Sequence, residues 1–392
     1  MRKNIFALAV LLCITAGLGF GAIDWNNPSF SIALTKSEIE AISGTSSDGA
    51  TSFSCSFIND WSGNLLLIQD PSGGTGSGTG LLVIDLASKT GSVRVTDAAL
   101  NAVCDQDILP VDTDVTGLAL DTWDDSVYIM DRHDTDQIIK VSSGGVASAL
   151  PGITGDTIGL NGVVCGDLSP IAGFETMRNL YYVNTDTGAV MEYPLEGSTE
   201  YIYMDKTSWT SITGGTQNGI SAGPVLFWGN SYSFLIFDEA SFGGTDSVIE
   251  VPVVYGDNRI FTPASVFGPS GAGLSTMVVT EDLTIIGWDE FGTPPNNFII
   301  VPQGTETPIR IPRSTIAAAL GIPETDINPS DENSMLLWID EGIYNPVPPY
   351  DWLGTRVEVL FGISGPTSGG CIGKMTFTSP VSLAVGIDWN MY

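Results

Sequence analysis

The chain has 392 residues, with 45 acidic side chains against 14 basic ones and a formal net charge of −31. This balance argues against nucleic-acid binding, because proteins that bind a phosphate backbone need a basic surface, and against adsorption to an anionic membrane. Metal cations or cationic partners suit it better, and simple solubility explains it equally well. A hydrophobic content of 43% excludes a largely disordered chain.

The first residues have the order of a secretory signal peptide. Arg2 and Lys3 precede an apolar run from Ile5 to about Phe20, and small residues follow. The run is shorter than the roughly 20 apolar residues that cross a bilayer. We therefore expect residues 1–21 to be removed and residues 22–392 to be secreted, into the extracellular space or the periplasm, without membrane insertion. Cleavage lowers the basic count from 14 to 12 and takes the net charge from −31 to −33.

One short pattern recurs through the rest of the chain: four mostly apolar residues followed by Asp or Asn. The six copies end at Asp70, Asp131, Asn184, Asp238, Asp289 and Asp340. A strand of small and apolar residues precedes most copies, and two further strands follow them. Four strands in about fifty residues is the size of one propeller blade.

The repeat decides the fold class. About 370 residues exceed the usual size of a single core, roughly 250–300 residues, and no such unit can bury both faces of its own sheet. We predict an all-β, six-bladed β-propeller with four-stranded antiparallel blades, forming one domain over residues 22–392. A pair of β-sandwiches is the main alternative. The predicted blades are centred near residues 66–95, 127–150, 180–204, 234–262, 285–311 and 336–363.

The ring needs a closing strand. Residues 29–42 resemble residues 309–320 and 93–103, because each segment runs from an apolar strand into a Ser- or Thr-containing helix start. We therefore expect residues 29–35 to form the outer strand of the last blade, so that the ring is closed by an N-terminal strand and has no open edge. Residues 371–389 are then either an alternative outer strand or an extra hairpin.

The second repeat carries a family resemblance. It spans Asp114 to Val141 and has the motif residues Gly117, Ala119, Asp121, Tyr128, Asp131, Ile138 and Lys140. It resembles a blade of the NHL-like or TolB-like class of six-bladed propellers, and the third repeat is a looser match. The resemblance implies an architecture only, because propellers of this class include binding modules, lactonases and other hydrolases.

Four cysteines remain after signal removal: Cys55, Cys104, Cys165 and Cys371. An even number in an exported protein favours two disulfides, of which four cysteines allow three pairings; buried thiols are the alternative. Cys104 and Cys165 lie in connections leading into neighbouring blades. Cys55 lies in the first blade, and Cys371 follows the sixth, its neighbour in the ring. This arrangement favours the pairs 104–165 and 55–371.

No catalytic residue is predicted. The single histidine, His133, lies in a turn, and no nucleophile motif accompanies it. Two acidic loops are candidate calcium sites: one ends in Asp112 and Asp114, and the other holds Asp131, Asp134 and Asp136. Closely spaced carboxylates suit Ca²⁺, although turn-forming aspartate is the alternative. No other cofactor is expected.

These observations favour a non-enzymatic binding or scaffold module for an extracellular protein or glycan, with calcium in a structural role. One alternative is a divalent-metal-dependent hydrolase of the gluconolactonase-like type. That family needs acidic and amide residues at the starts of several inner strands, and only Asp114 clearly fits. The other alternative is a self-associating surface or matrix protein.

Overall fold

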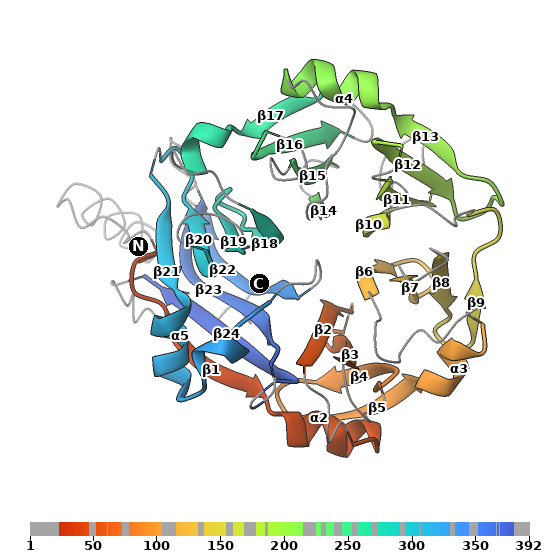
Figure 1. The fold of residues 1–392 in the computed structure, drawn as a ribbon, viewed down its shortest axis with the longest axis horizontal. Coiled ribbons are helices and arrows are strands. Elements are labelled where there is room, and N and C mark those ends of the chain that lie inside the picture. The colour runs from red at the N-terminus through yellow and green to blue at the C-terminus, as the bar shows by residue number, and fades with distance from the viewer. Residues whose placement is uncertain are drawn as a thin grey trace, which may run out of the picture.

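The computed structural model describes residues 23–46, 52–60, 62–72, 78–103, 115–131, 137–153, 160–167, 178–184, 187–214, 225–228, 233–238, 245–252, 257–267, 273–290, 295–305, 307–329, 334–344, 352–365, 367 and 369–379. Its strands form six four-stranded antiparallel sheets arranged radially (Figure 1). The protein is a six-bladed β-propeller, as the repeat predicts.

In blades 1 to 5 the chain runs outward through four consecutive strands. The innermost strands are β2 (Ser52–Asn59), β6 (Val115–Asp121), β10 (Leu160–Asp167), β14 (Val225–Trp228) and β18 (Leu274–Val279). The second strands are β3 (Leu65–Ser72), β7 (Ser126–Asp131), β11 (Arg178–Asn184), β15 (Ser233–Asp238) and β19 (Ile285–Asp289). The third strands are β4 (Leu81–Asp85), β8 (Gln137–Val141), β12 (Ala189–Pro194), β16 (Ser247–Pro252) and β20 (Asn297–Val301). The outer strands are β5 (Thr90–Val95), β9 (Ala147–Ala149), β13 (Tyr201–Met204), β17 (Arg259–Thr262) and β21 (Ile309–Pro312).

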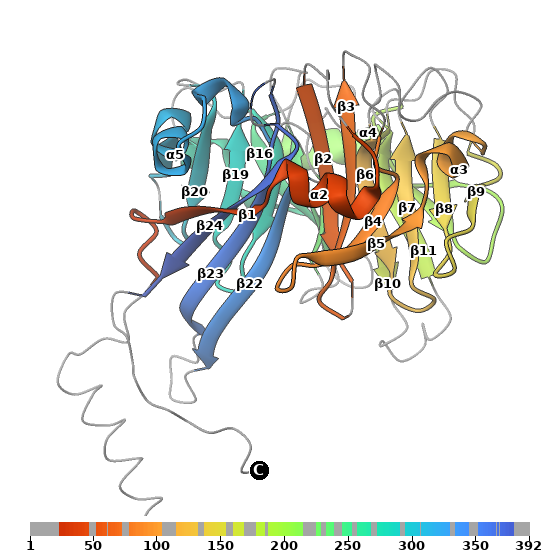
Figure 2. The same ribbon diagram turned by 90° about the horizontal axis from the view of Figure 1, so that it is seen from below.

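The sixth blade joins the two ends of the ring. Its order from the inside is β22 (Met335–Tyr344), β23 (Trp352–Ile363), β24 (Cys371–Thr378) and β1 (Ser29–Leu34). Strand β1 pairs antiparallel with β24, with Ser29 opposite Thr376 and Leu34 opposite Ile372, and the two strands run side by side in Figure 2. The N-terminal strand is therefore the outer strand of the last blade.

Two details of this blade differ from the sequence interpretation. The sixth copy of the repeated pattern, ending at Asp340, lies in innermost strand β22, whereas the first five copies lie in second strands. Of residues 371–389, the part up to Thr378 forms the third strand, β24, between β23 and β1. It is neither an outer strand nor an added hairpin, because β1 already occupies the outer position.

The apolar core is divided among the junctions between blades. Each of six clusters joins two neighbouring sheets: one cluster joins blades 1 and 2, for example, and another joins blades 6 and 1. Apolar residues follow one another without alternation in second strands such as β15, where every residue is buried. This is the pattern expected of a sheet that is covered on both faces.

Short helices cover most junctions at the rim. They are α2 (Lys36–Ser43), α3 (Asp97–Asn101), α4 (Lys206–Thr213), the 3-10 helix η2 (Ala264–Phe267) and α5 (Arg313–Leu320). Each follows an outer strand and inserts at least one almost fully buried apolar side chain into the adjoining cluster: Ile39, Leu100, Trp209, Phe267 and Ile316. A further 3-10 helix, η3 (Glu324–Asp326), follows α5.

The junction between blades 2 and 3 is different. Only residues 150–159 join β9 to β10, whereas residues 205–224 join β13 to β14. The described part of the short connection, residues 150–153, contains no helix. On the neighbouring outer strand β13, Tyr201 and Ile202 are 58% and 59% exposed. The equivalent Ile32 of β1 is half-buried against the cluster that α5 completes.

Candidate functional site

The Asp or Asn that ends each repeated pattern has a structural role where its side chain is described. Asp238 and Asp289 are fully buried at the ends of their strands. Asp238 accepts hydrogen bonds from the backbone N–H and the hydroxyl of Thr245, both at 3.0 Å. Asp289 accepts one from the backbone N–H of Gly273 at 2.9 Å and pairs with Arg310. The Asp238 carboxylate closes the turn that follows its strand, a common use of Asp, whereas the Asp289 carboxylate connects the end of β19 to the residue before β18 and to β21.

Most of the proposed metal ligands lie outside the described residues. These are Asp112, Asp114, Asp134 and Asp136, and His133 lies there as well. Asp131 is described as the last residue of β7, and its backbone lies opposite that of Val115, the first residue of β6. The described residues that border the acidic segments 104–114 and 132–136 in the sequence are therefore neighbours in the sheet. Among the described residues, no three His, Cys, Asp or Glu side chains are grouped so that they could hold a metal ion.

The predicted bridge between Cys55 and Cys371 is not formed in the structure, where both residues are thiols. Cys55 belongs to the cluster between blades 6 and 1, together with Ile372. Cys371 packs instead against the cluster between blades 5 and 6. Because successive side chains of a strand point to opposite faces, β24 directs Ile372 toward Cys55 and Cys371 away from it. The predicted 104–165 pair involves Cys104, outside the described residues, and Cys165, whose side chain is not described.

Some of the few basic side chains form ion pairs that connect neighbouring blades. Arg178 of β11 contacts the buried Asp121 of blade 2 at 2.7 Å and Asp124 at 3.5 Å. Burial raises the pKa of Asp121 in spite of its cationic neighbour. Of the basic side chains in the ion pairs of the described residues, Arg259 is the most exposed, at 66%. It is therefore the best placed of these cations to contact a ligand.

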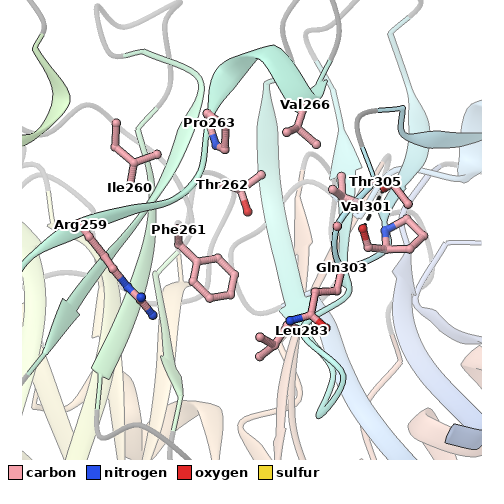
Figure 3. A pocket seen from close by; sticks show the side chains of 12 residues that line it. Arg259, Ile260, Phe261, Thr262, Pro263, Val266, Leu283, Val301, Gln303 and Thr305 are labelled. Atoms are coloured by element: carbon pink, nitrogen blue, oxygen red, sulfur yellow. Dashed lines mark hydrogen bonds between the residues drawn. The ribbon is translucent and has the colours of Figure 1, made fainter. Parts of the chain in front are cut away.

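Arg259 lies at the edge of a cavity between blades 4 and 5, with a volume of about 350 Å³ (Figure 3). One wall is outer strand β17 with the following turn and η2. The other wall comprises the β18–β19 turn and the segment that joins β20 to β21. The apolar lining is Ile260, Phe261, Pro263, Val266, Leu283, Val301 and Pro302, and the polar lining is Arg259, Thr262, Gln303 and Thr305. Phe261 and Gln303 point toward each other across it in Figure 3.

The cavity has a local structural origin. Outer strands β1, β5, β13 and β17 each carry a β-bulge one residue before their last residue, at Ala33, Arg94, Tyr203 and Phe261. The small Ala33 packs against the cluster between blades 6 and 1. Arg94 crosses to blade 2 and donates to the Ser142 carbonyl at 3.1 Å. Tyr203 crosses to blade 4 and donates to the Pro252 carbonyl at 2.8 Å. Phe261 occupies the same position without a polar end; it packs against the cluster between blades 4 and 5 and lines the cavity.

A buried carboxylate holds Arg259 in place. Its Nε donates to Oε2 of Glu250 at 2.6 Å, and the other oxygen of Glu250 accepts from the Ser233 hydroxyl at 2.9 Å. The Glu250 side chain is only 5% exposed. The hydrogen bond to Glu250 uses Nε, and 66% of the Arg259 side chain is exposed, which leaves its terminal nitrogens accessible to a ligand.

Sequence reasoning did not find this site. Arg259 precedes the short apolar segment Ile260–Phe261 and looks like an ordinary strand residue. The sequence feature that could have indicated it is an alignment of the outer strands. In that alignment Phe261 stands where β5 has Arg94 and β13 has Tyr203. That alignment depends on the position of the bulges, which the spacing of the repeat alone does not give.

The described helices are all too short or too polar to cross a membrane. No family model matches the chain, and no curated protein matches it.

Solved structures resemble the chain only distantly. A protein of unknown function from Bacteroides thetaiotaomicron VPI-5482 is 11% identical with a TM-score of 0.46, over 90% of this chain and 76% of that one. An auxiliary nutrient binding protein from the same organism is 13% identical with a TM-score of 0.45, over 84% and 69%. YCF48 bound to D1 peptide is 11% identical with a TM-score of 0.41, over 94% and 99%. The assignment of the propeller fold therefore rests on this chain's own strand order.

Proposed function

We propose that this protein is an exported binding module whose ligand site is the cavity between blades 4 and 5. The observation that carries the proposal is the asymmetry among equivalent positions: side chains with polar ends bridge two junctions, and the corresponding junction beside Phe261 is open. Ligand sites in proteins are concave, mostly apolar and furnished with a few polar groups, with volumes of about 300–1,000 Å³. The cavity fits this description.

Export, and membership of the NHL-like or TolB-like class, belong to the same proposal. They are supported by the signal-like N-terminus and by the motif residues of the second repeat. An extracellular protein or glycan remains the proposed kind of partner. Calcium at the acidic loops of blade 2 remains a prediction, supported by their closely spaced carboxylates and by the pairing of Val115 with Asp131, the described residues next to these loops in the sequence.

A neutral fluorescent probe tests whether the cavity accepts a ligand. N-phenyl-1-naphthylamine fluoresces strongly when it leaves water for an apolar site. We expect the native protein to increase its fluorescence in a saturable way, and Gln303→Trp to abolish the increase, because an indole at this exposed lining residue fills the cavity.

Ser143→Trp is the matched control, since Ser143 is an exposed residue in the corresponding turn of blade 2. This variant should bind the probe like the native protein. Equal binding by native protein and Gln303→Trp would place the probe elsewhere and refute the proposed site, as would no binding at all.

A further inference from the structure

The cavity has two chemically different parts. Phe261, Val266, Leu283 and Val301 provide an apolar surface, contributed by both blades. Arg259 provides a positive charge at the edge of the same space, as Figure 3 shows. An apolar ligand alone would use the first part and leave the second without a role.

Exposed basic side chains are few in the molecule, and Arg259 is the most exposed of those in the described ion pairs. The chain carries 45 acidic residues against 14 basic ones, and basic groups such as Arg94 and Arg178 are largely buried in contacts between blades, with 7% and 12% of their side chains exposed. The guanidinium of Arg259 is exposed beside an apolar cavity. It favours an anionic group at this point.

The geometry prepares Arg259 for such a group. Glu250 holds the Nε side of the guanidinium and is itself held by Ser233. A guanidinium offers five N–H donors in a planar fork that suits the two oxygens of a carboxylate. Fixing one side of the fork reduces the conformational entropy that ligand binding would cost.

We infer that the cavity binds an apolar group that carries a carboxylate, with the apolar part against Phe261 and the carboxylate on the terminal nitrogens of Arg259. The inference depends on the proposed function and specifies its ligand. Two sources share this chemistry: a small aromatic or aliphatic acid, and the C-terminal residue of a partner polypeptide. Gln303, on the opposite wall, offers its amide to either of them.

The experiment compares acids with their neutral amides. The small-molecule arm uses 4-phenylbutyrate and 4-phenylbutyramide, and the peptide arm uses acetyl-Gly-Gly-Phe with a free or an amidated C-terminus. Each compound is titrated against the bound naphthylamine probe and, independently, by calorimetry. We expect the acid of at least one pair to bind at least about tenfold more tightly than its amide, because hydrogen bonds to charged groups are the stronger ones. The arm that shows the preference identifies the source.

Arg259→Met should remove the preference for the acid and leave the binding of the neutral probe in place. Arg259→Lys should retain part of the preference, since it keeps the charge without the fork. Arg356→Met is the control, because Arg356 pairs with Glu358 in blade 6 and does not line the cavity. Equal affinity of acids and amides in the native protein would overturn the inference while probe binding still supported the site. An acid preference that persisted in both Arg259 variants would overturn it too. A protein that binds neither probe nor acid would refute the site and the inference together.

Discussion

Single residues in this ring act mainly at the junctions between blades, and Arg178 is the clearest case. It is bonded to Asp121, whose side chain is fully buried, and only 12% of its own side chain is exposed. Removing one partner of a buried pair leaves the other charge without compensation, which typically costs about 3–5 kcal/mol. Arg178→Met should therefore lower the free energy of unfolding by roughly 3 kcal/mol at neutral pH, as measured in urea.

The loss of stability in Arg178→Met should depend on pH through the ionisation of Asp121. Burial already raises the pKa of Asp121, and loss of Arg178 raises that pKa further. A carboxyl whose pKa is higher in the folded state than in the unfolded state destabilises the fold as it ionises. The defect of Arg178→Met should therefore shrink as pH falls through the raised pKa toward the ordinary value for Asp, 3.8.

Lys89→Met provides the contrast. Lys89 pairs with Glu38 at 2.9 Å, but 42% and 31% of the two side chains are exposed, and exposed pairs contribute about 1 kcal/mol or less. A similar loss of stability in both variants would show that the contact between Arg178 and Asp121 is no more important than a surface pair.

At the scale of elements, the short helices at the rim decide which outer-strand residues are covered. Ile32 of β1 packs against the cluster that α5 completes, whereas Ile202 of β13 is 59% exposed beside the junction without a described helix. Replacing each Ile by Thr keeps the β-branched shape and adds a hydroxyl. Ile32→Thr should cost about 1–2 kcal/mol, and Ile202→Thr should change stability by less than about 0.5 kcal/mol. Urea unfolding of both variants is the measurement; an equal cost at the two sites would contradict the described exposure of Ile202.

Much of this element structure could be predicted from the sequence. The repeated pattern predicted the blades. The pattern of an apolar strand followed by a helix start at Thr35 predicted the closing strand, and the Thr35 side chain does cap α2. The sixth copy was placed in the wrong strand, since both innermost and second strands of a doubly covered sheet can be four apolar residues followed by Asp. The hydrogen bond that Asp340 accepts from the Glu281 backbone, at 2.6 Å, differs from the turn-closing bonds of Asp238.

The candidate site could not be predicted in the same way. The acidic loops chosen for calcium were conspicuous because carboxylates are adjacent in sequence there. The cavity, by contrast, brings together Arg259, Leu283 and Gln303 from two blades. The equivalence of Phe261 with Arg94 and Tyr203 becomes visible only from the positions of the bulges in three dimensions.

For the whole molecule, the dominant physical property is self-repulsion. A net charge of −31 destabilises a compact state, because like charges are closer together in the folded chain than in the unfolded one. Raising NaCl from about 0.01 M to about 1 M shortens the Debye length from roughly 30 Å to roughly 3 Å. The Tm should therefore rise by several degrees over this range. The rise should be much smaller at about pH 3.5, where many carboxylates are protonated. A Tm that fell with salt at neutral pH would mean that attractive ion pairs outweigh the repulsion.

The seam between β1 and β24 has a mechanical consequence. The strands are antiparallel, and the beginning of β1 lies beside the end of β24, where the Asp24 N–H donates to the Thr378 carbonyl at 3.1 Å. Tension applied at these two points would load the hydrogen bonds of the seam one after another, as in a zipper, and not all together. A pulled molecule would therefore open at the sixth blade under modest tension, while the sheets of the other five blades stayed intact.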